Sequence, residues 1–292
     1  MRFRDLHPTQ GKYAWLWLAM LAIILLAGNA RTGLWDQDEA AYAGFGRTML
    51  QTGDWVVPDF TWSKFHRKPP LHFWGIASSQ AVFGDNEWAT RLPAAVALWL
   101  CAWLFWKKGS SIYGKEIGRW AALILGSSGL FQAMGHISLT DGTLLLWQTL
   151  AAISLLGVLN GFKGQAWVFW LAIGLGVLTK GPPIIIFAGG MGLLLMLFHP
   201  HKKFLFQVRF WIGAPLAVIP ILIWGYMAYQ RDNGEFVNWL IDWYILRRHA
   251  LPNAWGPVIV AVSFGIGIAI LLEAYLSFLG IGLPLDSVSW GS

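Results

Sequence analysis

The sequence predicts an all-α fold, a polytopic bundle of about seven or eight transmembrane helices with amphipathic helices on the membrane surface. Three observations support this prediction. The chain of 292 residues is 56% hydrophobic and 12% charged, with 20 tryptophans and 33 glycines, which suit membrane interfaces and close helix contacts. Charge-free apolar segments recur along the chain, without the alternating stretches of about ten residues that build barrels. The net charge of +6 comes from basic residues between apolar segments, which indicates membrane orientation rather than nucleic-acid binding.

The apolar segments set the predicted order of spans. They are charge-free and cover residues 13–30, 92–106, 120–135, 142–162, 164–179, 181–198 and 210–230. An eighth apolar segment begins near Ala250. Several are shorter than the ~20 residues that cross a bilayer, so we expect tryptophan and tyrosine at their ends to extend them into the interface.

Lysines and arginines assign the orientation of these spans. With the basic N-terminus in the cytoplasm, alternation of the spans places the basic segments 107–119 and 201–209 on the cytoplasmic side as well. The long segment 31–91 then lies on the outer side. Asp141 and Lys180 fall in two short turns on that same outer side.

The first outer segment is predicted to contain two helices that lie along the membrane surface. Ala40–Leu50 can form an amphipathic helix, with Gly53 as its C-terminal stop. Leu71–Phe83 is a second apolar stretch, too short to span a bilayer and followed by Gly84.

Two charged groups mark the starts of these surface helices. Asp38 and Glu39 begin the first, where Asp36 and Glu39 have the spacing of a capping box and acids favour a helix N-terminus. The alternative, functional interpretation of Asp38 is a general base for an acceptor hydroxyl. Lys68 lies just before the second helix, whose start is fixed by two prolines. A lysine next to a helix N-terminus favours either an anion-binding site or contact with anionic lipid headgroups.

Two further charges lie at the outer ends of spans. Charges at such positions are functional candidates, although Asp141 can also be a helix cap and Lys180 can extend to the interface. Because all four groups lie on one side, a single lipid-phosphate substrate can contact them. The histidines His66, His72 and His136 lie on that side too, without a fixed spacing, and leave a divalent metal open as a cofactor.

An ordered set of motifs then points to a known family. Asp38 and Glu39, with Tyr42 three residues later, are followed by "ML..GDW..P", "KPPL.FW", "FG.NEWATRLPAA", "LTD" and "LTKGPP". In this order, over about residues 10–235, they resemble the bacterial GT-C glycosyltransferases, which include protein O-mannosyltransferase-like and aminoarabinose-transferase-like enzymes. The resemblance implies inverting transfer of a sugar from a polyprenyl-phosphate donor to a lipid or protein hydroxyl. It also implies a multi-pass protein of the bacterial inner membrane whose active site faces the periplasm, with membrane lipids as partners and no nucleic acid.

The resemblance also implies the site residues. It assigns catalysis to Asp38 and Glu39, with Asp38 as the base, and binding of the donor phosphate and substrate to Lys68, Lys180, Asp141, Tyr42, Arg67 and His66. The chain departs from the family where Ala41 replaces a frequent arginine and Gly44 a frequent glutamate. Arg67 replaces a frequent acidic residue that joins a metal site, so no metal ligand is assigned.

The end of the chain resembles a different family. Ile245–Gly291, with "RRHALPN" and "LLEAYLSFLGIG", is similar to the later part of oligopeptide/dipeptide ABC-transporter permeases. Seven spans place residues 231–249 outside, whereas the corresponding permease loop is cytoplasmic. We therefore expect a chimera of a truncated GT-C region, 1–243, and a permease-like transmembrane fragment, 244–292, joined by rearrangement or by an error in assembling the sequence. The alternative functions are an inner-membrane permease component of a peptide transporter, or a protein that keeps a lipid-phosphate pocket without turnover.

Overall fold

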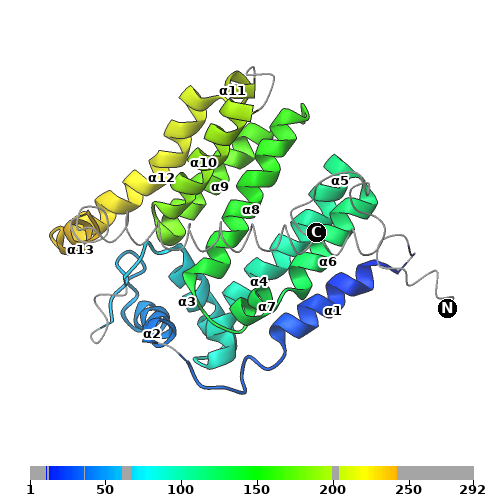
Figure 1. The fold of residues 1–292 in the computed structure, drawn as a ribbon. Coiled ribbons are helices and arrows are strands. Elements are labelled where there is room, and N and C mark those ends of the chain that lie inside the picture. Colours follow the sequence, from blue (N-terminus) through cyan, green and yellow to red (C-terminus); the bar gives the residue numbers. More distant parts are fainter. Residues whose placement is uncertain (1–10, 12, 36, 61–66, 199–203, 242–292) are drawn as a thin grey trace, which may run out of the picture. The chain divides into compact units, whose positions relative to one another are not determined.

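The computed structural model describes residues 11, 13–35, 37–60, 67–198 and 204–241. All regular elements within these ranges are helical (Figure 1). The chain divides into two compact units, Met1–Val237 and Asn238–Ser292. Residues beyond 241 lie outside the described part, so the predicted boundary at 243 and the permease-like fragment stay predictions.

The described residues form a succession of helices. They are α1 (Trp15–Leu26), α2 (Gln37–Thr52), α3 (Leu71–Phe83), α4 (Glu87–Leu104), the π-helical turn η3 (Phe105–Gly109), α5 (Ser110–Tyr113), α6 (Lys115–Ser127), α7 (Gly129–Gly135), α8 (Thr140–Leu159), α9 (Gln165–Lys180), α10 (Pro183–Phe198), α11 (Phe204–Gln207), α12 (Phe210–Arg231) and α13 (Glu235–Trp239).

The apolar helices confirm the predicted all-α membrane fold. Within the described residues, three helical stretches are long and apolar enough to cross a membrane, namely Glu87–Tyr113, Thr140–Leu159 and Phe210–Arg231. Three shorter apolar helices, α1, α9 and α10, coincide with three further predicted spans. The predicted span 120–135 is built differently, because the backbone is extended at Ser128 (φ −68°, ψ 136°) and divides it into α6 and α7. The total number of spans stays a prediction.

Helices α2 and α3 correspond to the two predicted surface helices. α3 has the predicted bounds, and α2 begins slightly earlier than predicted. Gly53, at φ +71°, ends α2 and its N–H donates to the Met49 carbonyl at 3.0 Å. The apolar face of α2 packs on α3 through Tyr42, Phe45 and Phe73, so these two helices form a common core.

Helix α8 organises the remaining bundle, because it packs against α4 on one side and α9 on another (Figure 1). α9 in turn packs against α10 and α12. The approach of α9 to α12 depends on Gly174, where an added Cβ would lie 2.9 Å from the Ala217 carbonyl oxygen. Such close contact requires a residue without a side chain.

Candidate functional site

Three charged side chains from three other segments act electrostatically on Lys68. Asp38 lies in the first turn of α2, and Lys68 lies in the segment that leads into α3. Asp141 lies in the first turn of α8, and Lys180 is the last residue of α9. Burial lowers the pKa of Lys68, the charges of Asp38 and Asp141 oppose this shift, and the charge of Lys180 reinforces it. The predicted acids and lysines therefore lie within electrostatic reach of Lys68.

Lys180 and Asp141 form an ion pair at the ends of α9 and α8. The Lys180 Nζ lies 2.6 Å from Asp141 Oδ1 and 2.7 Å from Oδ2. The side chains are 23% and 45% exposed, so solvent or a ligand can reach the pair. The alternative that Asp141 caps α8 is wrong, because the capping position is occupied by Leu139.

Next to Asp38, the carboxylate of Glu39 is completely buried and accepts four hydrogen bonds. Arg91 donates through Nε to Oε1 at 2.8 Å and through Nη2 to Oε2 at 2.9 Å. The backbone N–H groups of Ser138 and Trp35 donate to Oε1 and Oε2, both at 2.8 Å. Glu39 is therefore a buried anchor for α2, whereas Asp38 is partly exposed.

Arg91 completes this network with its remaining N–H groups. Its Nη1 donates to the carbonyls of Asn29 and Thr32 at 2.7 and 2.9 Å, and its Nη2 donates to the Gly33 carbonyl at 2.9 Å. All five guanidinium donors thus have an acceptor. Arg91 consequently ties the segment after α1 to both α4 and α2.

The pKa of Glu39 shows the balance of forces in this network. Burial by itself raises that pKa, but hydrogen bonds from Arg91, Ser138 and Trp35 and the charge of Arg91 lower it overall. A carboxyl with a depressed folded-state pKa contributes stability above its ordinary value, and this contribution is lost as the pH falls through the folded-state value. The network is therefore an acid-sensitive element of the fold.

Two other predicted site residues, Tyr42 and Arg67, have buried side chains. Tyr42 is 1% exposed, and the centroid of its ring lies 5.1 Å from the centroid of the Phe73 ring. Arg67 is buried and its Nη2 lies 2.5 Å from Asp59 Oδ1. His66 and Asp36 lie outside the described residues.

The described residues contain no group of three or more histidine, cysteine or acidic side chains arranged for a metal ion. The ring nitrogens of His136 lie 2.8 Å from the Gln132 carbonyl oxygen and 3.0 Å from that of Ala27. His72 instead contacts Thr143 and Ser138. The structure does not bring these two histidines to one site.

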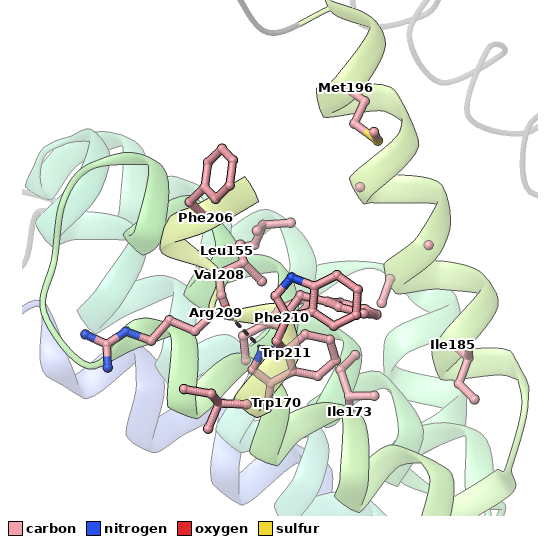
Figure 2. Close-up of a pocket in the computed structure, with 15 residues that line it drawn as sticks. Leu155, Trp170, Ile173, Ile185, Met196, Phe206, Val208, Arg209, Phe210 and Trp211 are labelled. Carbon is pink, nitrogen blue, oxygen red and sulfur yellow. Dashed lines mark hydrogen bonds between the residues drawn. The ribbon is translucent and has the colours of Figure 1, made fainter. Parts of the chain in front are cut away.

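A separate apolar pocket of about 860 Å³ lies among α8, α9, α10 and α12 (Figure 2). Phe169, Trp170 and Ile173 of α9 form part of its lining. Among the described residues that line the pocket, Arg209 is the only charged one. Its side chain points away from the aromatic cluster in Figure 2, with the guanidinium 5.4 Å from the centroid of the Trp167 ring. None of the four charged site residues lines this pocket, so its lining suits hydrocarbon and not a phosphate.

The sequence analysis missed Arg91, Ser138 and Thr143. A signal for Arg91 was present, because a lone arginine within an apolar helix is almost never buried without a partner. It stands in the quoted motif "NEWATRLPAA". Ser138 and Thr143 carry no comparable signal, because hydroxyl residues occur throughout such helices.

The chain contains apolar helices that can cross a bilayer, and an acidic and a basic side chain pair at the ends of two of its helices. These features define a helical membrane protein with a charged site at the helix ends. Residues 67–226, more than half of the chain, match the family model of the dolichyl-phosphate-mannose-protein mannosyltransferases. The chain belongs to this family, which confirms the predicted resemblance to GT-C glycosyltransferases.

Individual relatives agree with this assignment. The undecaprenyl phosphate-alpha-4-amino-4-deoxy-L-arabinose arabinosyl transferase of Aeromonas hydrophila is 32% identical over 233 residues, which are 76% of this chain and 41% of the relative. The crystal structure of ArnT from Cupriavidus metallidurans bound to undecaprenyl phosphate has a TM-score of 0.71 at 23% identity, covering 78% of this chain and 43% of that one. Its apo structure has a TM-score of 0.75 at 21% identity, covering 92% and 51%.

These matches set the scope of the assignment. The chain spans less than half the length of the curated relatives that it matches. Both relatives described above are transferases of one kind, and they give no support to the permease alternative.

Proposed function

We propose that the chain belongs to an enzyme that transfers a sugar from a polyisoprenyl-phosphate donor to an acceptor hydroxyl at the periplasmic face of the bacterial inner membrane. The observation that carries the proposal is the electrical environment of Lys68, on which Asp38, Asp141 and Lys180 all act. A potential base, Asp38, and a second cation, Lys180, are thus both within electrostatic reach of Lys68. The names of the relatives support the choice of donor, because both the Aeromonas enzyme and the bound crystal structure concern undecaprenyl phosphate.

The proposed reaction follows from the residue types. Asp38 accepts the proton of the acceptor hydroxyl, and the oxygen attacks the anomeric carbon from the face opposite the phosphate. The bond between that carbon and the phosphate oxygen breaks, its electron pair leaves with the polyisoprenyl phosphate, and the anomeric configuration is inverted. Lys68 and Lys180 stabilise the negative charge that grows on the departing phosphate. The reaction requires no covalent intermediate with the protein.

The structure supports different roles for the two adjacent acids. Glu39 is buried and accepts four hydrogen bonds, so we propose that it positions Asp38 and takes no part in proton transfer. Asp141 is proposed to hold Lys180 in place. Tyr42 and Arg67 are proposed to support the floor of the site, because both side chains are buried.

The donor is proposed only as far as the relatives agree. The family model refers to mannose on dolichyl phosphate and the curated relative to aminoarabinose on undecaprenyl phosphate. Their common part is a sugar on a polyisoprenyl phosphate, which is the part that the lysines contact in this proposal. The acceptor is a hydroxyl of a lipid or a protein.

Lys68→Ala tests the phosphate site. We expect the dissociation constant of a polyisoprenyl phosphate to rise about ten- to a hundredfold, because a hydrogen bond to a charged group contributes roughly 1.5–3 kcal/mol. Calorimetric titration of the purified chain in detergent measures this change. Lys163→Ala is the matched control, because Lys163 is exposed in the connection at the opposite end of α9 from Lys180. Equal affinities of the Lys68 variant and the unmodified chain would place the phosphate elsewhere.

The apolar pocket is proposed to hold part of the isoprenoid chain of the donor. Ile173, which lines the pocket, precedes Lys180 by seven residues of α9, or about 10 Å at the helical rise. A chain whose phosphate lies at Lys180 can therefore reach the pocket along α9.

Gly189→Leu tests this placement. Gly189 lines the pocket and Gly190 does not, and an added Cβ meets nothing within 4 Å at either position. We expect the leucine to weaken binding of a long-chain polyisoprenyl phosphate by roughly 4- to 15-fold, the loss of one or two buried CH₂ groups at ~0.8 kcal/mol each. Gly189→Leu is expected to bind a two-isoprene phosphate as tightly as the unmodified chain does. Gly190→Leu is expected to bind both the long and the short ligand with unchanged affinity. Equal affinities of Gly189→Leu and the unmodified chain for the long ligand would place the isoprenoid chain elsewhere.

A further inference from the structure

His72 is a buried histidine that the proposed reaction does not use. It lies in the first turn of α3, four residues after Lys68, and is 1% exposed. Its Nδ1 lies 2.9 Å from Thr143 Oγ1, and its Nε2 lies 3.5 Å from Ser138 Oγ. Its ring also packs edge-on to Tyr42, with the centroids 6.0 Å apart.

The neighbouring bonds determine which ring nitrogen carries the proton. Ser138 Oγ donates its only hydrogen to the Thr90 carbonyl at 2.7 Å, so it can only accept from His72. Nε2 is therefore the protonated nitrogen, and Nδ1 is an acceptor for the Thr143 hydroxyl. A neutral imidazole satisfies both contacts. Burial also lowers the pKa of His72 to about 4, in agreement with a neutral ring.

These bonds form a continuous chain that runs in one direction. Thr143 donates to His72, His72 donates to Ser138, and the backbone N–H of Ser138 donates to Glu39, which Arg91 also holds. The chain thereby joins α8, α3, the segment before α8, and α2.

Three residues of this chain also lie close in sequence to a charged residue of the proposed site. Glu39 directly follows Asp38, His72 follows Lys68 by four residues, and Thr143 follows Asp141 by two. These segments are distant in sequence, so their relative positions depend on tertiary contacts such as this chain. A displacement of about 1 Å in an active site can cost about 10²-fold in rate.

We propose that His72, as a neutral imidazole protonated on Nε2, is a positioning residue that holds α2, α3 and α8 in the spacing required by Asp38, Lys68 and Asp141. This role rests on the proposed function. It also differs from that of an inert core side chain, because it requires one tautomer and one hydroxyl partner.

His72→Phe and Thr143→Val test the role through turnover. Phenylalanine keeps an aromatic ring against Tyr42 but removes both hydrogen bonds, and valine removes only the donor to Nδ1. We expect each to lower kcat by about 10- to 100-fold, with KM for the donor changed less than threefold. Thr143→Ser keeps the hydroxyl and is expected to restore kcat. The double variant is expected to be no slower than the slower single variant, because one chain is interrupted in each case.

Ser154→Ala is the matched control. Ser154 is also buried on α8, and its hydroxyl has no hydrogen-bond partner within the described part of the chain. Its removal is expected to leave kcat unchanged.

Nitrogen-15 NMR of histidine-labelled full-length protein in nanodiscs gives a reading that does not depend on turnover. The His72 signal is identified by its loss in His72→Phe. We expect the neutral Nε2–H pattern between pH 6 and 8, and a shift of Nδ1 in Thr143→Val. A charged ring or the Nδ1–H tautomer overturns the inference, even if turnover is normal.

The outcomes separate the inference from the function on which it rests. If the unmodified chain is active and the His72→Phe and Thr143→Val variants keep its full kcat, the positioning role is refuted and the proposed function stays intact. An unmodified chain without turnover, when presented with a polyisoprenyl-phosphate sugar and an acceptor lipid, overturns both. If His72→Phe fails to fold, the comparison of Thr143→Val with Thr143→Ser decides.

Discussion

Asp38→Asn is expected to lower kcat by about 10²–10⁴-fold, the usual contribution of a general base. The amide has nearly the same shape as the carboxylate but cannot accept the proton of the acceptor hydroxyl. Binding of the polyisoprenyl phosphate is expected to persist, because the proposed phosphate contacts come from the lysines. Multiple-turnover transfer from a saturating radiolabelled donor measures kcat, and titration with the unglycosylated polyisoprenyl phosphate measures binding.

Glu87→Gln provides the control for this experiment. Glu87 lies in the first turn of α4, as Asp38 does in α2, so the two substitutions remove the same charge from equivalent helical positions. We expect Glu87→Gln to keep full turnover. An Asp38→Asn variant as fast as this control would show that another group removes the proton.

Arg91→Ala is expected to lower the free energy of unfolding by about 3–5 kcal/mol, because it leaves the buried carboxylate of Glu39 without its partner. Arg91 is 1% exposed and Glu39 is 0% exposed, so solvent cannot replace the lost guanidinium. Reversible unfolding of the purified chain in mixed micelles, with increasing SDS, measures the difference.

Two comparisons separate charge burial from lost packing. Arg47→Ala breaks a half-exposed pair with Asp85 and is expected to change the free energy of unfolding by about 0–1 kcal/mol. The double variant Arg91→Met with Glu39→Leu is expected to be more stable than Arg91→Met alone, since no unpaired charge remains. An Arg91→Ala variant as stable as Arg47→Ala would contradict the role given to this pair.

The sequence predicted most of the helices, and it predicted which helix ends would bring the charges of Asp141 and Lys180 to the same side. Alternation of spans places the start of α8 and the end of α9 on the same side, which is why Asp141 and Lys180 could be expected together. The observed ion pair agrees with that expectation. Their specific pairing, with Lys68 beside them, depends on how α3 packs, and this was not available from hydropathy.

The sequence could not distinguish the roles of Asp38 and Glu39. Successive residues of an α-helix point about 100° apart, so one acid can face the core while its neighbour faces the site. Which acid faces inward depends on Arg91, 52 residues after Glu39, and on the backbone of Ser138, 99 residues after it. Local sequence carries no information about such distant partners.

The break at Ser128 was missed for a similar reason. Hydropathy alone joins residues 120–135 into one apolar segment, because the residues around the break are uncharged. The extended backbone at Ser128 separates α6 from α7, and a hydropathy profile does not report backbone conformation.

The resting site balances two carboxylates, Asp38 and Asp141, against two ammonium groups, Lys68 and Lys180. Under the proposed mechanism this neutrality ends with the reaction. Asp38 takes up a proton, while the phosphate changes from a diester to a more negative monoester. The spent lipid carrier therefore meets a more cationic environment than the donor met on arrival. The proposed site therefore holds the released carrier more tightly than it holds the donor.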